Sequence, residues 1–210
     1  MQFYTPQSKQ NFSNPRGFTL IELLMVIAVI LILAGITFSV SRGVQNAQAR
    51  AKAKAELANF SQSLEQYKSV NGDYPWEAGS GEIGQAQEFA KALMGWTEFS
   101  QSGTSVVYRD KSNVPPIGPK TFIDPKKLSY VGILPSQSND KPTNLHFTDP
   151  WGNAYIYNYR TSTSNSWENF GYVLYSKGPD SSHVAVSSDG ILDATLRQNS
   201  NNADNIYAGE

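Results

Sequence analysis

The pattern of hydrophobic and polar residues predicts a long N-terminal helix whose two halves differ in character. From Leu23 to Ile36 no residue carries a polar side chain, and apolar neighbours extend this run to 18–40. At a rise of about 1.5 Å per residue, a helix of this length crosses a bilayer core of about 30 Å. A chain of 210 residues can hardly bury a helix that is apolar on every side. The run therefore favours a membrane-spanning helix over a core helix.

A cleaved secretory signal peptide is an alternative for the same run. Arg16 precedes the run, and Leu33-Ala34-Gly35 loosely resembles a small-residue cleavage site. Glu22 argues against this alternative, because a carboxylate has no purpose near the start of a discarded apolar segment. The helical pattern also continues past the run, which favours a retained anchor.

Beyond the apolar run, the pattern predicts that the helix continues with one apolar face. No proline occurs between Arg16 and Pro75, and Asn71-Gly72 is typical of a helix C-terminus. The apolar residues that recur at steps of three or four are Ala49, Ala53, Leu57, Phe60, Leu64 and Tyr67. We therefore expect a helix from Phe18 to about Val70 whose second half covers a globular head. A coiled coil is the alternative for this half.

The pattern in the rest of the chain predicts a small head that contains both helix and strands, so the predicted fold class is α+β. An apolar stripe from Ile83 to Trp96 predicts a second helix, and the Pro-rich stretch 114–119 predicts an exposed loop. Asp124-Pro125 and Leu134-Pro135 predict further turns.

Two strands are predicted near the end of the head. Tyr155, Tyr157 and Tyr159 alternate with other residues at the strand period, and 171–176 reads as the antiparallel partner across a polar loop. A row of tyrosines is also compatible with a sugar-binding platform. Packing against the long helix explains these side chains more simply.

Composition excludes several classes of function. The 17 basic and 18 acidic residues give a net charge of −1, which argues against nucleic-acid binding through a basic surface. The absence of cysteine removes thiol catalysis, cysteine-based metal sites and disulfides. We find no nucleophile elbow, zinc-protease pair or phosphate-binding glycine loop, so we expect no enzyme. His183 beside Asp180 and Ser182 suggests a hydrolase, but catalytic triads seldom come from neighbours in sequence.

Glu22 is the one charged residue inside the apolar run. A carboxylate at membrane depth costs about 3 kcal/mol and is a functional candidate by default. Snorkelling toward the interface would soften this cost. Otherwise the carboxylate needs a cation, and the apolar segment contains none, so the cation would come from another chain.

The segment Arg16-Gly17-Phe18-Thr19-Leu20-Ile21-Glu22 ahead of an apolar helix resembles the N-terminus of type IV prepilins and of the pseudopilins of type II secretion. The resemblance implies that a prepilin peptidase cuts between Gly17 and Phe18 and methylates the new Phe18 amine. Residues 1–17 would then be a cytoplasmic leader, 18–40 the transmembrane and filament-core helix, and 41–72 its amphipathic continuation. In a filament, Glu22 would pair with the Phe18 amine of a neighbouring subunit.

The head strengthens this resemblance at two places. Residues 71–75 (NGDYP) resemble the helix-to-head junction of the major pseudopilins, and 148–157, which contain DPWGN, resemble a segment characteristic of them. By this resemblance the head, 73–210, divides into a variable insert (76–148) and a C-terminal sheet and loop (149–210). The insert is either a partner surface or padding.

A calcium site is implied by the same resemblance. Residues 176–180 match the S-x-G-x-D stretch that opens the calcium-binding loop of major pseudopilins. Asp180 is the first candidate ligand, and Asp204 is the second carboxylate chosen from a tail that also contains Asp189 and Asp193. The alternative is that these residues are solvated turn residues.

The resemblance implies a structural subunit of a type II secretion pseudopilus that drives protein export. Its partners would be prepilin peptidase, other copies of itself, minor pseudopilins, the inner-membrane assembly platform and, before assembly, membrane lipid. It would reside in the bacterial inner membrane as a single-pass protein with a periplasmic head. A surface type IV pilus subunit is the alternative, and a membrane-anchored sugar-binding module or hydrolase is a more distant one. Without the leader the chain keeps 15 basic and 18 acidic residues, a formal charge of −3.

Overall fold

The computed structural model describes residues 17–111, 120–134, 141–163 and 166–209, and no side chains for 36–42. The chain forms two compact units, Met1–Gln45 and Asn46–Glu210. Of the predicted leader, only Gly17 is among the described residues, and the predicted loop at 114–119 lies outside them.

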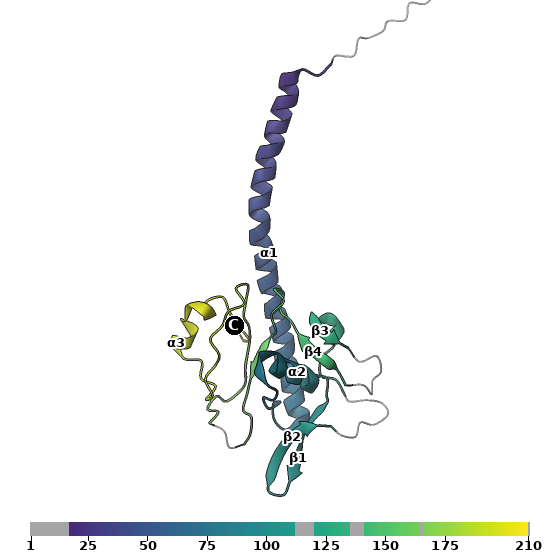
Figure 1. Ribbon diagram of the computed structural model, residues 1–210, viewed down its shortest axis with the longest axis vertical. Helices are drawn as coiled ribbons and strands as arrows, with labels where there is room; N and C mark the ends of the chain where they lie inside the picture. The colour runs from purple at the N-terminus through teal and green to yellow at the C-terminus, as the bar shows by residue number, and fades with distance from the viewer. Residues whose placement is uncertain (1–16, 112–119, 135–140, 164–165, 210) are drawn as a thin grey trace, which may run out of the picture. The chain divides into compact units, whose positions relative to one another are not determined.

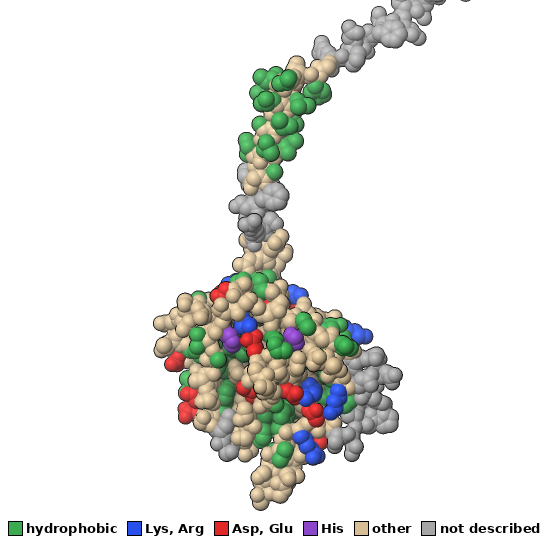
Figure 2. Space-filling view, viewed as in Figure 1, with side chains coloured by type: hydrophobic (Ala, Val, Ile, Leu, Met, Phe, Trp, Pro, Cys, Tyr) green, Lys and Arg blue, Asp and Glu red, His purple; other side chains and the backbone are tan. Residues whose placement is uncertain are grey.

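The first unit contains the beginning of helix α1 (Leu20–Asn71), which confirms the predicted long helix. Its apolar side chains stand exposed around the helix, as Figure 2 shows for the visible face. Leu20 is 82% exposed and Leu31 is 70% exposed. Within the described part of the chain, no helix meets the length and apolarity that a membrane span requires. The exposed apolar surface is the main chemical property of this unit.

The second unit contains the rest of α1, and the apolar face predicted for it is confirmed. Ala53, Leu57, Phe60, Leu64 and Tyr67 are each at most 1% exposed. They occur at the helical spacing that places side chains on one side of the helix. This face forms one wall of the main core of the head.

Helix α2 (Gly81–Leu93) confirms the predicted second helix and forms another wall of the core. It buries Ala86, Phe89, Ala90 and Leu93. It contacts strands β4 (Thr143–Phe147) and β5 (Ile156–Asn158), and Figure 1 shows α2 beside β4. Because α2 presents its apolar stripe toward the same core as α1, the two helices share one hydrophobic cluster.

The segment expected to be a variable insert contains four strands that the sequence pattern did not predict. Strands β1 (Thr97–Ser102) and β2 (Ser105–Asp110) form an antiparallel hairpin closed by Gly103, whose positive φ suits a two-residue turn. Strands β3 (Tyr130–Ile133) and β4 (Thr143–Phe147) form a second pair, preceded by the short 3₁₀ helix η1 (Pro125–Lys127). The described parts of the insert therefore contain regular secondary structure.

The C-terminal part folds into a three-stranded antiparallel sheet. Strand β5 (Ile156–Asn158) pairs with β6 (Val173–Ser176), which confirms the two predicted strands, and β6 also pairs with β7 (Ile206–Tyr207). A short helix α3 (Ala194–Arg197) and a 3₁₀ helix η2 (Ser200–Asn202) lie between β6 and β7 in sequence. The α+β fold class is confirmed.

This sheet is buried on both faces. Tyr155, Tyr157 and Tyr159 belong to the main core that α1 and α2 cover, and each is at most 6% exposed. Ile156 joins Tyr175 in a second, smaller cluster. The three tyrosines therefore pack inside the head and form no exposed platform for a sugar.

Candidate assembly and cation sites

Helix α1 begins with a reciprocal pair of hydrogen bonds between Thr19 and Glu22. The Thr19 N–H donates to Glu22 Oε2 at 2.8 Å, and the Glu22 N–H donates to Thr19 Oγ at 3.3 Å. The Thr19 hydroxyl also donates to Glu22 Oε2 at 2.7 Å. This is a capping box, in which two unpaired N–H groups of the first turn are satisfied by side chains. Thr19 is the N-cap, and Gly17 and Phe18 precede the helix and are exposed.

The structure thus gives Glu22 a neutral partner in its own chain, which the charge pattern of the sequence did not predict. In the described part of the chain, no ion pair includes Glu22. The available signal was the T-x-x-E spacing from Thr19 to Glu22 directly ahead of an apolar run. The cation expected from a neighbouring subunit stays a prediction.

In the head, the DPWGN segment is a turn organised by Asp149, which is 2% exposed. Asp149 Oδ1 accepts the backbone N–H groups of Trp151 at 3.0 Å and Asn153 at 2.8 Å. Its Oδ2 accepts from the Ser176 hydroxyl at 2.6 Å and from Asn153 Nδ2 at 3.3 Å. A buried carboxylate requires such compensation, and here hydrogen-bond donors supply it.

The two residues predicted to bind calcium lie next to each other, although 24 positions separate them. The Asp180 N–H donates to Asp204 Oδ2 at 3.2 Å. The other oxygen, Asp204 Oδ1, is buried and has no hydrogen-bond partner in the described structure. Asp180 Oδ1 accepts the Ser182 N–H at 2.8 Å. No group of three or more His, Asp or Glu side chains gathers around a cation-sized space among the described residues.

The other two aspartates of the tail have local roles. Asp193 caps α3 by accepting the Leu196 N–H at 2.7 Å. Asp189 accepts from the Ser187 hydroxyl and the Ile191 N–H, and these hydrogen bonds lower the pKa of its carboxyl group. None of these contacts includes Asp180 or Asp204.

A polar cluster attaches the loop after β6 to the start of α2. Glu82 forms an ion pair with Lys177, and its other oxygen lies 3.6 Å from His183 Nε2. His183 Nδ1 shares a hydrogen bond of 2.7 Å with the Tyr175 hydroxyl. Burial lowers the pKa of His183, and nearby Lys177 lowers it further while Glu82 opposes the shift.

The suggested hydrolase arrangement of Asp180, Ser182 and His183 is not formed. The Ser182 hydroxyl faces the Asp180 backbone carbonyl at 3.4 Å, while the His183 ring contacts Tyr175 and Glu82. A triad requires the serine hydroxyl to face the imidazole and the carboxylate to orient it. Their closeness in sequence therefore does not correspond to catalytic geometry.

The NGDYP junction is held by Asp73 at the end of α1. Asp73 pairs with Arg160 and accepts hydrogen bonds from Trp76 Nε1 at 3.1 Å and the Tyr159 hydroxyl at 2.8 Å. Burial by itself would raise the pKa of Asp73, but these donors outweigh burial and lower it. The junction therefore locks the end of α1 to the residues that follow β5.

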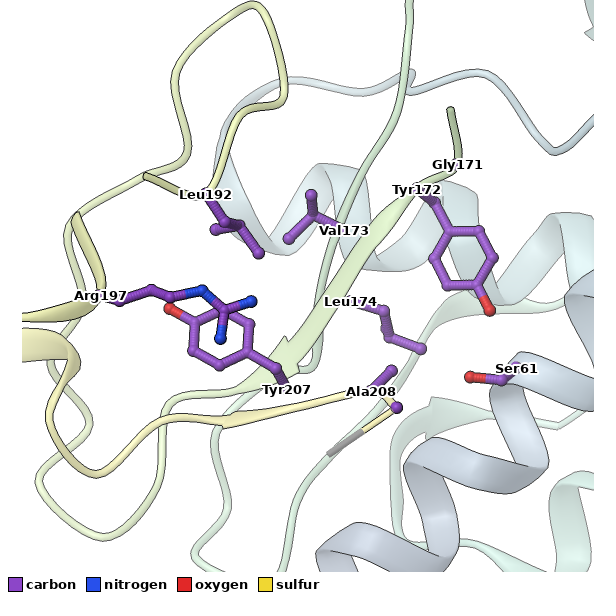
Figure 3. A pocket seen from close by; sticks show the side chains of 10 residues that line it. Ser61, Gly171, Tyr172, Val173, Leu174, Leu192, Arg197, Tyr207 and Ala208 are labelled. Atoms are coloured by element: carbon purple, nitrogen blue, oxygen red, sulfur yellow. The ribbon is translucent and has the colours of Figure 1, made fainter. Parts of the chain in front are cut away.

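Figure 3 shows a hollow of about 400 Å³ in the head. Its walls include Val173 and Leu174 from β6, and the Arg197 guanidinium lies 5.2 Å from the centre of the Tyr207 ring. Ser61 and Tyr172 lie on another wall. The hollow combines apolar and aromatic side chains with one guanidinium, and its lining contains no histidine, aspartate or glutamate to act as a base.

The N-terminal segment belongs to a known class: residues 12–38 match a family model described as the prokaryotic N-terminal methylation motif. Among characterised proteins, the chain is similar to type II secretion system core protein G of Escherichia coli (strain K12). The two are 26% identical over 165 residues, which cover 79% of this chain and 82% of that protein. No solved structure gives a significant match. The predicted resemblance to pilin-like proteins, and to pseudopilins in particular, is confirmed by these matches.

Proposed function

We propose that the chain is a pseudopilin, a structural subunit of a type II secretion pseudopilus without catalytic activity. The observation that carries the proposal is the exposed apolar surface of the first part of α1, which lies within the segment matched by the methylation motif. Such a surface has no role in a monomer in water, and it fits both a bilayer and the interior of a filament. The similarity of the chain to type II secretion system core protein G supports the secretion role over a surface pilus.

The proposed mechanism is assembly directed by charge. Cleavage after Gly17 gives Phe18 an α-amino group with an ordinary pKa of about 8, so the amine is mostly cationic at neutral pH. Lipid tails are as apolar as leucine, so moving the helix from membrane to filament gains little hydrophobic free energy. Pairing of Glu22 with the Phe18 amine of a neighbour would then set the position of each added subunit.

As a pseudopilin, the chain would have a defined location and defined partners. Residues 18–40 anchor the chain in the bacterial inner membrane as a single pass, and the head faces the periplasm. Prepilin peptidase processes the chain, and the inner-membrane assembly platform adds it to other copies and to minor pseudopilins. Extension of the filament pushes exported proteins outward. Nucleic acid is not among the partners.

Processing tests this function directly. When the chain is co-expressed with a prepilin peptidase, we expect intact-mass spectrometry to find a product that lacks residues 1–17 and carries N-methylated Phe18. The control is Gly17→Leu, which should remain full length, because a large side chain replaces the glycine at the cleavage site. A wild-type chain whose Gly17–Phe18 bond stays intact would refute the proposal.

We further propose that Asp204 and Asp180 bind a structural calcium ion. Calcium prefers six to eight oxygen ligands at about 2.3–2.6 Å, from carboxylates and backbone carbonyls. A buried carboxylate oxygen without a partner, such as Asp204 Oδ1, fits this preference. Bound calcium would tie the end of β6 to the segment before β7.

Calcium binding is measurable on the full-length chain in detergent micelles. We expect a saturable calorimetric signal and, at about 100 times Kd, about 2.7 kcal/mol of added stability over the chelator-treated protein. Asp204→Asn should lose both effects, whereas Asp189→Asn, in the same tail, should keep them. Equal melting temperatures in calcium and chelator, with no binding heat, would exclude the site.

A further inference from the structure

The DPWGN turn and the loop after β6 meet at one glycine. The Gly178 N–H donates to Ser176 Oγ at 3.1 Å, and the Gly178 carbonyl accepts from Asn153 Nδ2 at 2.9 Å. Asn153 lies 25 positions before Gly178, so this contact joins two separate segments of the head. Both backbone polar groups of Gly178 are therefore held by side chains.

Asp149 orients the two side chains that hold this glycine. Its Oδ2 accepts from the Ser176 hydroxyl and from Asn153 Nδ2, and its Oδ1 accepts two backbone N–H groups of its own turn. Hydrogen bonds to a charged acceptor are shorter and stronger than neutral ones, and a buried network with every member satisfied favours one geometry. Asn153 and Ser176 consequently have little freedom to point elsewhere.

Gly178 in turn lies directly against Asp204. A Cβ atom on Gly178 would stand 2.6 Å from the Asp204 backbone oxygen and 2.9 Å from its Oδ2, and its φ of +70° also favours glycine. The Asp204 carboxylate therefore lies close to the Gly178 backbone that Asn153 and Ser176 hold. Any shift of this glycine changes the room left for the carboxylate.

We propose that Asn153 and Ser176 are positioning residues for the cation site at Asp204 and Asp180. They touch no cation themselves, and they act by fixing Gly178, which fixes the Asp204 carboxylate and leaves Oδ1 available. This inference rests on the proposed calcium site. Groups that orient metal ligands from behind typically change metal affinity by about 10–100-fold when removed.

The test compares three alanine variants of the full-length chain in detergent micelles. Asn153→Ala and Ser176→Ala should raise the calcium Kd by about 10-fold or more in titration calorimetry. The matched control is Asn169→Ala, because Asn169 Nδ2 also donates to a glycine carbonyl, that of Gly190, at 3.2 Å. Its calcium Kd should equal that of the wild type. Circular dichroism at the titration temperature confirms that each variant is folded.

The outcomes separate this inference from the calcium proposal. If the wild-type chain gives no calcium heat, the calcium site itself is wrong. If the wild type binds calcium and Asn153→Ala and Ser176→Ala bind it equally well, only the positioning role is wrong. A merely structural role would lower the melting temperature in chelator while the Kd of the folded chain stays unchanged. An equal loss of affinity in Asn169→Ala would also overturn the inference.

Discussion

Replacing Glu22 with alanine is expected to leave membrane insertion intact and to abolish incorporation into filaments. In the proposed filament, the variant leaves the Phe18 amine of a neighbour buried without a counter-charge. Loss of one partner of a buried ion pair costs about 3–5 kcal/mol, and each 1.4 kcal/mol is a factor of about ten in an equilibrium constant. We therefore expect filament-incorporated subunit to fall at least about a hundredfold. Shearing followed by immunoblotting, together with membrane fractionation, measures both quantities.

Two companion variants separate the charge of Glu22 from its capping role. Glu22→Gln keeps a side chain suited to the capping box but removes the charge, so it should fail to assemble like the alanine variant. Thr19→Val removes the hydroxyl that accepts the Glu22 N–H but keeps the carboxylate, and it should still assemble. Normal filaments from Glu22→Ala would show that the carboxylate merely snorkels. Normal filaments from Glu22→Gln alone would assign its role to the capping box.

Replacing Phe60 with alanine is expected to destabilise the head strongly. Phe60 is 0% exposed, and its ring centre lies 5.6, 5.2 and 5.0 Å from those of Phe89, Phe147 and Tyr155. The cavity left in place of a buried phenylalanine costs about 3–5 kcal/mol. For a unit of this size, the melting temperature should fall by about 10 °C.

The matched control for this prediction is Phe170→Ala. Phe170 is fully exposed, so the same change in chemistry should alter the free energy of unfolding by no more than about 0.5 kcal/mol. Thermal unfolding of the full-length chain in micelles, followed by near-ultraviolet circular dichroism, compares the two variants. Similar melting temperatures for Phe60→Ala and Phe170→Ala would contradict the described core.

The helices and the central strands were predictable because their apolar periods are strong. The buried face from Ala53 to Tyr67 follows the helical repeat over several turns, and alternating tyrosines mark β5. The hairpin of β1 and β2 was missed because its residues are mostly polar and half exposed, with Gly103 as its clearest signal. Strand β7 has two residues and exists by pairing with Tyr175 and Ser176, which no local pattern contains.

The candidate sites were predictable to different degrees. The resemblance selected Asp180 and Asp204, and the structure places them in contact, while calcium itself stays a prediction. The contact of Asn153 with Gly178 was not predictable, because it depends on how the DPWGN turn meets a loop 25 positions away. At the N-terminus, the position of Glu22 in the apolar run predicted a cationic partner from another chain. Its partners within the chain are the neutral donors of Thr19, three residues earlier.

The capping box also has a consequence for proteolysis. Because α1 begins directly after its N-cap Thr19, Gly17 and Phe18 lie in irregular, exposed backbone ahead of the helix. A peptidase that binds its substrate in extended form can therefore reach the Gly17–Phe18 bond without unwinding a turn of helix. Thr19 and Glu22 would thus act before assembly as well, by keeping the proposed cleavage site outside helix α1.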